Sequence, residues 1–396
     1  MKTLIEIHAL QNYAPSNLNR DDTGAPKDAI FGGHRRARIS SQCQKHAVRS
    51  YFGELVEAEK LPPETLAVRT KRLRQEMIDR LERMGRQADM AKGKATSALA
   101  SAGLAVKEDG KTEYLLFLGE REIAALADIV HAHWEAIPAE SAPVDTDAAT
   151  SGGKKTKTKN KGNEQIGKEI QDVLKKVLDG GKAAAVALFG RMLADMPEAN
   201  QDAACQVAHA ISTHAVEREF DFYTAIDDLK PDDTAGADMM GTIEFNAACY
   251  YRYAALDFGK LAENLQGDKD LARTAALAFL EGFILSEPTG KQNTFAAHNP
   301  PEFVFVTFGG RMPRNLANAF ETPVRVPRGK GSDMKLTEIS AKALLEQVGK
   351  LDGFYGVQGR RLSMGGDKVD VNGAKAESVI SFEELLSRVE AWLREG

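Results

Sequence analysis

The alternation of hydrophobic and polar residues predicts a chain that mixes strands with helices. In residues 3–10, Ile5 and Ile7 fall on one side and Glu6 and His8 on the other, which is typical of a strand. Residues 43–55 repeat apolar positions at helical spacing, so they predict a helix whose N-cap is Ser40 or Ser41. The intervening residues 11–39 predict a long irregular loop, because prolines and glycines interrupt them.

Further along, the same patterns predict a split βαβ arrangement. Helices are expected at residues 58–137, 164–178 and 270–285, and strands at residues 184–189, 205–213, 241–254 and 303–308. The order strand, helix, strand, strand, helix, strand is that of the ferredoxin-like fold, which RNA-recognition modules also use. We therefore expect the fold class α+β, with a helical insertion after the first helix and a long hairpin between the middle strands.

Residues 138–163 differ from the rest of the chain. They have low complexity and many lysines, with one valine as their only large apolar residue. Such a segment cannot bury enough surface to offset the entropy lost on folding. We expect a flexible lysine-rich loop.

Composition excludes several protein classes. With 43% hydrophobic and 28% charged residues among 396, the chain is close to the average globular protein. No segment approaches the ~20 apolar residues of a membrane helix, and Glu6 and His8 stand where a signal peptide would be apolar. Cys43, Cys205 and Cys249 are far apart and form no CxxC pair. A cytoplasmic protein without a membrane partner is expected.

The net charge of -5 hides a strong segregation of charge. Residues 29–50 contain no acid, whereas residues 219–238 contain seven acids and one lysine. The basic side chains of the acid-free stretch are Arg35, Arg36, Arg38, Lys45 and Arg49. Polyanion binding would therefore be local, and the acidic segment is suited to meet a basic surface of another copy.

Residues 17–41 combine three features that suit phosphate binding. Glycines let the backbone approach a phosphate, arginines donate to its oxygens, and serines with free amides at a helix start accept an anion. The alternative is a basic loop that only interacts with solvent.

At this point the sequence resembles a known family. LNRDD at residues 18–22, KDAIFGG at 27–33 and RRARISSQ at 35–42 are similar to the backbone subunit of the type I-E CRISPR Cascade complex, the CasC family within the RAMP superfamily. The similarity continues in GRM at 190–192, AHAISTH at 208–214, FYTAIDDL at 222–229, CYYRYA at 249–254 and GKQNTFAAHNP at 290–300. It departs in the lysine-rich segment and in the tail after about Thr322.

The resemblance implies three parts and a non-catalytic role. The parts are an RRM-like palm of residues 1–57 and 184–396, a helical finger of residues 58–183, and a thumb hairpin at about 214–241. Copies would stack head to tail on a CRISPR guide RNA and present it in segments for pairing with target DNA in antiviral defence. The other partners implied are the large, small, 5'-handle-binding and guide-processing Cascade subunits, with no cofactor or metal.

The resemblance, together with the basic stretch, also assigns binding residues. Guide RNA contacts fall on Arg20, Lys27, Arg35, Arg36, Arg38, Ser40, Gln42, Lys45 and Arg49, and thumb and base contacts on Met192, Phe222, Tyr223 and Thr224. Cations and amides that hold phosphates carry no sequence information, as a subunit serving any guide requires. Alternatively, Phe222 and Tyr223 pack within the thumb and Met192 fills a core. For target DNA the candidates are Lys154, Lys155, Lys168, Lys175 and Lys176.

An enzyme is the main rival, as a metal-dependent RAMP-type ribonuclease that cuts guide or target RNA. Asp28 is its sharpest candidate, and His8 with His34 is a weaker acid–base pair. His131 and His133 diverge on a helix, so a zinc site is not expected. A protein scaffold without RNA is the third class, and it leaves the acid-free stretch unexplained.

Overall fold

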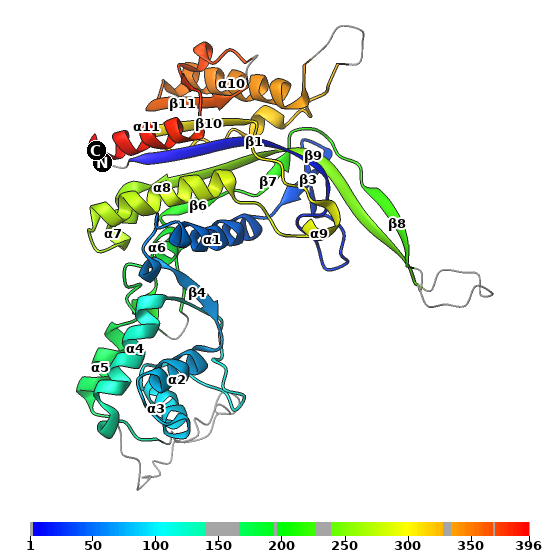
Figure 1. The fold of residues 1–396 in the computed structure, drawn as a ribbon. Helices are drawn as coiled ribbons and strands as arrows, with labels where there is room; N and C mark the ends of the chain where they lie inside the picture. The colour runs from blue at the N-terminus through cyan, green and yellow to red at the C-terminus, as the bar shows by residue number, and fades with distance from the viewer. Residues whose placement is uncertain are drawn as a thin grey trace, which may run out of the picture. The chain divides into compact units, whose positions relative to one another are not determined.

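The computed structural model describes residues 3–139, 166–193, 196–225, 239–327, 334–366 and 369–395. The chain forms two compact units (Figure 1). The first comprises Met1–Leu61, Cys205–Leu261 and Ala272–Gly396, and the second Pro62–Ala204 and Ala262–Leu271. Most of the predicted loop at 138–163, including Lys154 and Lys155, lies outside the described residues. In the described ranges, no helix has the length and apolar character needed to cross a membrane.

A ten-stranded sheet dominates the first unit. Its strands are β1 (Leu4–Ser16), β2 (Asp28–Phe31), β3 (His34–Ile39), β6 (Cys205–Val207), β7 (Ala210–Ser212), β8 (Glu219–Ala225), β9 (Met239–Asp257), β10 (Phe303–Gly310), β11 (Arg360–Gly365) and β12 (Glu377–Val379). Its helices are α1 (Ser41–Glu57), α9 (Gln292–Phe295), α10 (Leu336–Tyr355) and α11 (Phe382–Glu395), with 3₁₀ turns η4 (Ala317–Phe320) and η5 (Asn372–Ala374). Two more helices, α7 (Phe258–Asn264) and α8 (Lys269–Leu285), contain residues of both units.

The centre of the sheet has the ferredoxin-like strand order. β10, β1 and β9 are antiparallel neighbours, and β6 and β7 pair with the far side of β9. Ile7 of β1, for example, pairs with Val306 on one side and Ala254 on the other. The helix α1 follows β1 and α8 follows β9, as the split βαβ plan requires. The predicted α+β class is confirmed.

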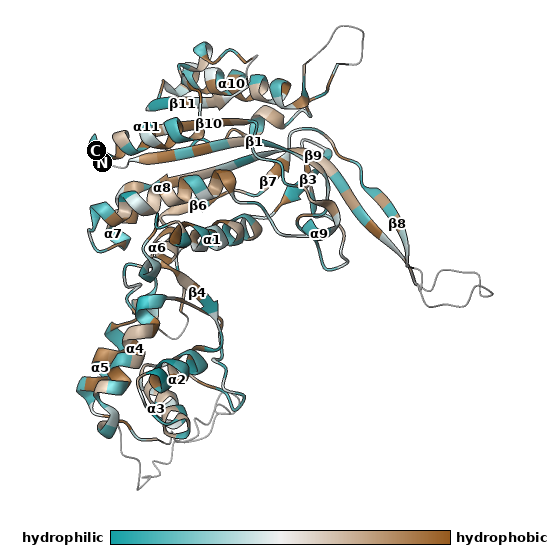
Figure 2. Cartoon of the chain, in the orientation of Figure 1, coloured by the Kyte–Doolittle hydropathy of each residue, from teal (hydrophilic) through white to brown (hydrophobic). Residues whose placement is uncertain are grey.

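Helical segments cover both faces of this central sheet. Tyr251 and Tyr253 of β9 lie in one hydrophobic cluster with Leu344 of α10. Arg252 points the other way, where its Nε donates to Gln44 of α1 and its Nη2 to the carbonyl of Phe283 of α8. Figure 2 shows α8 as largely hydrophobic, in keeping with the many buried residues along it. The sheet is therefore buried on both sides at its centre.

The second unit is mainly helical. Its helices are α2 (Leu73–Arg83), α3 (Ala88–Ser101), α4 (Glu120–Ala132), α5 (Lys168–Lys176) and α6 (Ala184–Phe189). A two-stranded sheet of β4 (Ala67–Thr70) and β5 (Leu116–Gly119) and the 3₁₀ turns η1 (Pro63–Thr65), η2 (Trp134–Ala136) and η3 (Pro197–Ala199) complete it.

A buried ion pair joins distant segments of the second unit. Arg191 Nη1 lies 2.8 Å from Glu122 Oε1, and both side chains are 1% exposed. The same carboxylate accepts from the backbone amides of Gly119 and Gly180. Because every buried charge here has partners, the pair fixes the GRM segment to α4.

Three local predictions were wrong. Residues 184–189 form α6 instead of a strand, because a short buried apolar run has no diagnostic period and its alanines favour a helix. Residues 11–39 are not irregular throughout, since β1 extends to Ser16 and the hairpin β2–β3 follows. The strands β4 and β5 interrupt the stretch that was predicted to be helical. Each has four residues, which are too few to show the alternation of a strand.

Candidate nucleic-acid interface

The hairpin β2–β3, here called the basic hairpin, carries the arginines of the acid-free stretch. Its strands pair from Asp28 with Ala37 to Phe31 with His34. Gly32 and Gly33 turn the chain at φ values of +58° and +78°, and a Cβ on Gly32 would lie 1.8 Å from the carbonyl oxygen of Glu321. Glycine is therefore required for this turn. Alternation along β3 then sends neighbouring arginines to opposite sides.

Arg36 points inward, which corrects its prediction as an RNA contact. The side chain is fully buried. Its Nη1 donates to the carbonyls of Ser212 and Thr213, and its Nη2 donates to those of Phe320 and Glu321. These bonds satisfy the ends of the guanidinium with backbone acceptors from two distant segments. Arg36 therefore stabilises the fold.

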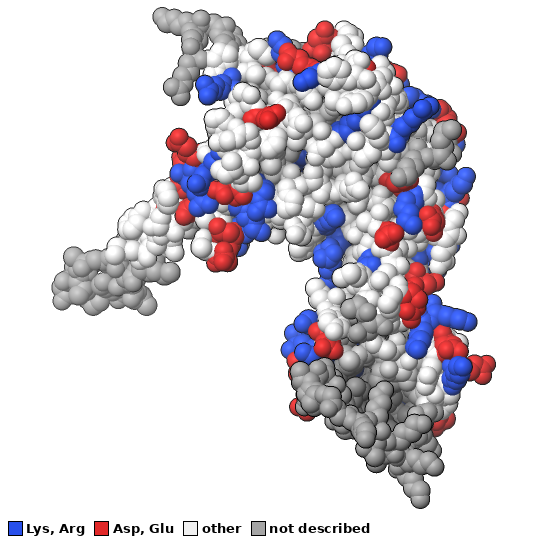
Figure 3. All heavy atoms as spheres, turned by 180° about the vertical axis from the view of Figure 1, so that it is seen from behind, with Lys and Arg blue, Asp and Glu red and all other residues white. Residues whose placement is uncertain are grey.

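Arg35 points outward and is half exposed, and Asp28 is its partner. Arg35 Nη1 lies 2.8 Å from Asp28 Oδ2, and Arg218 Nη2 lies 2.9 Å from the same oxygen. Arg218 Nη1 also pairs with Glu244 of β9 at 2.9 Å. Asp28 thus joins the basic hairpin to the root of the β8–β9 hairpin. Figure 3 shows acidic and basic side chains mixed at this root.

These contacts oppose a catalytic role for Asp28. Its carboxylate faces two guanidinium groups, which compete with a metal for the same oxygen. In the described part of the chain, no group of three or more His, Cys, Asp or Glu side chains is placed to hold a metal ion.

The proposed acid–base histidines are also in different environments. His8 is buried with its Nδ1 at 2.9 Å from the hydroxyl of Tyr251, and burial lowers its pKa to about 3. His8 is therefore neutral near pH 7 and enclosed in the sheet, so it is unsuited to RNA cleavage. His34 lies exposed at the end of the basic hairpin.

Lys27 and Arg38 form a second basic pair, and both are half-buried. The amide of Arg38 donates to the carbonyl of Lys27, and its Nη1 lies 3.0 Å from His209 Nδ1. Asn19 holds this region to the start of α1. Its backbone oxygen accepts from the Lys27 amide and its Oδ1 from the Ser40 amide.

The start of α1 places the remaining predicted contacts. Ser40 is the N-cap, and its buried hydroxyl accepts from the Cys43 amide. Ser40 therefore offers its hydroxyl first to the helix. Gln42 is exposed and Lys45 and Arg49 are half-buried along α1. Arg20 is exposed in a bridge to Pro26.

The β8–β9 hairpin separates the predicted thumb residues by face. Phe222 is 63% exposed and shares its face with Phe220, which is 65% exposed, and with Thr224. Tyr223 is on the opposite face, opposite Gly241, where a Cβ would lie 2.5 Å from Tyr223 Cζ. Packing within the hairpin, the alternative to a contact with RNA, therefore suits Tyr223 and not Phe222. Residues 226–238 lie outside the described residues, and with them most of the acidic segment.

The second unit holds the other predicted contacts. Met192 is 82% exposed, so it does not fill a core. Lys168, Lys175 and Lys176 are exposed on α5, while Leu174 of the same helix is buried. The three lysines therefore face solvent, and the exposed acids Glu169 and Asp172 lie on the same helix.

Sequence reasoning missed Asn19, His209 and Arg218. Asn19 and His209 lie within the segments LNRDD and AHAISTH, and Arg218 is a basic residue directly before the acidic segment. His209 and Arg218 contact residues more than a hundred positions away, and Asn19 bonds Lys27 and Ser40 across a loop, so no local pattern marks these partners.

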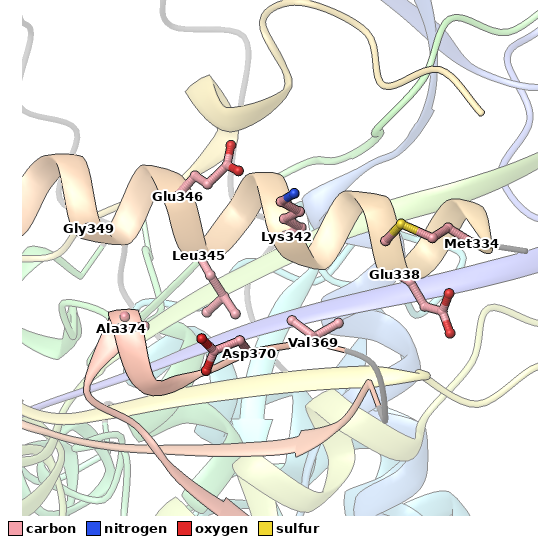
Figure 4. Close-up of a pocket in the computed structure, with 10 residues that line it drawn as sticks. Met334, Glu338, Lys342, Leu345, Glu346, Gly349, Val369, Asp370 and Ala374 are labelled. Atoms are coloured by element: carbon pink, nitrogen blue, oxygen red, sulfur yellow. The ribbon is translucent and has the colours of Figure 1, made fainter. Parts of the chain in front are cut away.

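A pocket of about 490 Å³ lies elsewhere in the first unit, between α10 and the η5 segment (Figure 4). Leu345 and Val369 point into it, and Glu338 and Asp370 lie at its sides. None of the predicted binding residues that the structure describes lines it. The candidate interface is therefore an open surface and not this pocket.

Comparisons with known proteins match nearly the whole chain. Residues 5–390 match the model of the family described as "CT1975-like protein". A chain of a "CRISPR RNA-guided surveillance complex, pre-nicking" is 31% identical, with a TM-score of 0.79 over 98% of this chain and 100% of that one. A chain of a "CRISPR RNA-guided surveillance complex" is 27% identical, with a TM-score of 0.71 over 98% and 99%. No curated protein matches by sequence.

Proposed function

Because the chain belongs to the family of CT1975-like proteins, we propose that it is a guide-RNA-binding subunit of a CRISPR surveillance complex. More specifically, it is a backbone subunit of a type I-E Cascade complex, several copies of which line one guide. The near-complete coverage of two chains from surveillance complexes supports an equivalent place in the assembly. The large, small, 5'-handle-binding and guide-processing subunits are its expected neighbours.

One observation carries the RNA-binding part of this proposal. The basic hairpin, the loop before it and the exposed side of α1 gather Lys27, Arg35, Arg38, Gln42 and Lys45 within the first unit. Such side chains hold phosphates with charge and donated hydrogen bonds, and they do not read base edges. A guide of any sequence fits this chemistry.

The central sheet argues against the stacking mode of RNA-recognition modules. Those modules stack bases on aromatic side chains of an open sheet face. Here Tyr251, Tyr253 and Phe305 are buried in a core that includes α10. RNA is therefore expected at the edge formed by β2 and β3 and beside the β8–β9 hairpin.

The β8–β9 hairpin is the proposed thumb. Phe222 and Thr224 share one face with Phe220, and Met240, 66% exposed, pairs with Thr224. Exposed apolar side chains on a hairpin can enter between bases and unstack them without reading them. Tyr223 instead braces the hairpin against Gly241. Met192, exposed in the second unit, is the proposed contact for a displaced base.

Charge supports two further parts of the proposal. The α5 lysines, with Lys154 and Lys155, attract the phosphates of target DNA toward the second unit. The acidic segment at 219–238 meets a basic surface of the next copy, which is a heterologous contact that repeats along the guide.

Co-purification with the neighbouring subunits tests the proposal. We expect the purified complex to contain RNA, and expect the double variant Lys45→Gln/Arg49→Gln to lose most of that RNA. The matched control is Lys342→Gln/Lys350→Gln on α10, which removes the same charge from exposed positions and should retain RNA. An assembly that contains no RNA and ignores added RNA would refute the proposal.

A further inference from the structure

His209 lies between β6 and β7, beside the basic hairpin, and has no role in the function proposed above. Its side chain is exposed, and its Nδ1 lies 3.0 Å from Arg38 Nη1. A guanidinium only donates hydrogen bonds, so His209 Nδ1 accepts. The neutral ring then carries its proton on Nε2, and this N–H is a donor for a further group.

The surroundings of His209 are positively charged. Partial burial lowers the pKa of His209, and the charges of Arg38 and Lys27 lower it further. These two cations, from β3 and from the loop before β2, are the charged groups that influence it. Nearby Asp28 does not compensate, because its carboxylate pairs with Arg35 and Arg218 and only its backbone oxygen accepts from Arg38 Nε.

This arrangement fits an anion with several oxygens. A phosphate can accept from Arg38, from Lys27 and from the imidazole at once, and its charge removes the repulsion among them. We propose that His209, Arg38 and Lys27 together hold one backbone phosphate of bound RNA, and that His209 strengthens this contact as the pH falls. The inference rests on the proposed RNA-binding function and adds a contact and a pH dependence to it.

The direction of the pH effect follows from the charges. In the free protein the pKa of His209 lies below its ordinary value of 6.5, because partial burial disfavours the charged ring and the two cations disfavour a third positive charge. A bound phosphate favours the imidazolium and raises this pKa. RNA affinity should therefore rise as the pH falls through the raised pKa of the complex, and should level off below the pKa of the free protein. Each unit of pKa difference corresponds to about tenfold in affinity at most.

Binding of a labelled single-stranded oligouridine, at constant ionic strength, tests this inference. Between about pH 7.5 and about pH 5.5 we expect the wild-type affinity to rise about three- to tenfold. His209→Gln still accepts from Arg38 and donates to a phosphate, but it cannot be charged, so its gain should be much smaller. His133→Gln, an exposed histidine at the end of α4 in the other unit, is the control and should keep the wild-type gain.

A second measurement does not depend on the variant. In histidine-labelled wild-type protein, NMR should show the pKa of His209 rising when oligouridine is added. An unchanged pKa, or a His209→Gln variant with the full pH-dependent gain, would overturn the inference while leaving RNA binding intact. If wild-type protein failed to bind oligouridine at either pH, the proposed function itself would fail.

Discussion

Two adjacent arginines of β3 have opposite roles because a strand sends successive side chains to opposite faces. Arg36 donates to four backbone carbonyls in the interior, whereas Arg35 is half exposed and pairs with Asp28. The same residue type therefore stabilises the interior at one position and forms a surface ion pair at the next.

This difference predicts opposite outcomes for one substitution. Arg36→Gln should lower the free energy of unfolding by about 2–4 kcal/mol, because it leaves buried carbonyls without donors. Arg35→Gln should lower it by less than about 1 kcal/mol, as expected for an exposed ion pair. Urea unfolding of both variants measures the difference, and equal losses would contradict the assignment of Arg36 to the core.

At the scale of elements, the β8–β9 hairpin is a two-faced ribbon. Phe220 and Phe222 are exposed on one face, while Tyr223 covers Gly241 on the other. The root is held by Arg218, whose guanidinium pairs with both Asp28 and Glu244. An anchored root gives the exposed aromatic face a defined position relative to the basic hairpin.

We predict that Phe222→Ala reduces base unstacking more than it reduces binding. RNA that carries 2-aminopurine should brighten less on binding this variant than on binding the wild type, because the ring that would separate two bases is absent. Tyr223→Phe keeps the ring against Gly241 and should behave like the wild type. Equal brightening with Phe222→Ala would mean that the aromatic face does not enter between bases.

At the scale of the whole molecule, binding depends on local charge, because the net charge of -5 opposes a polyanion. RNA binding through contacts with phosphates should therefore be sensitive to salt. The logarithm of RNA affinity should fall with the logarithm of salt concentration by ~0.7 for each phosphate neutralised on a single strand.

The double variant Arg35→Gln/Arg38→Gln should make this slope shallower by ~0.7–1.4, as one or two phosphate contacts are lost. Lys342→Gln/Lys350→Gln changes the net charge equally and should leave the slope unaltered. A wild-type affinity that does not respond to salt would contradict phosphate binding.

Much of the fold followed from the sequence, because it depends on local periodicity. The alternation of Ile5 and Ile7 with Glu6 and His8 predicts β1, and the apolar stripe within residues 43–55 predicts α1. The acid-free stretch was likewise visible without a structure, because charge composition can be read directly from the sequence. Segments too short for a period, such as α6 and β4, could not be assigned this way.

What the sequence alone determined was therefore the α+β class, the order of its main elements and the position of a stretch of basic residues without acids. Only the tertiary structure decided what each side chain there does. It buried Arg36 against Phe320, placed His209 beside Arg38 and joined Arg218 to Asp28. The physical reason is that these partners are more than a hundred residues apart in the chain, so strand pairing across the sheet, and not local pattern, brings them into contact.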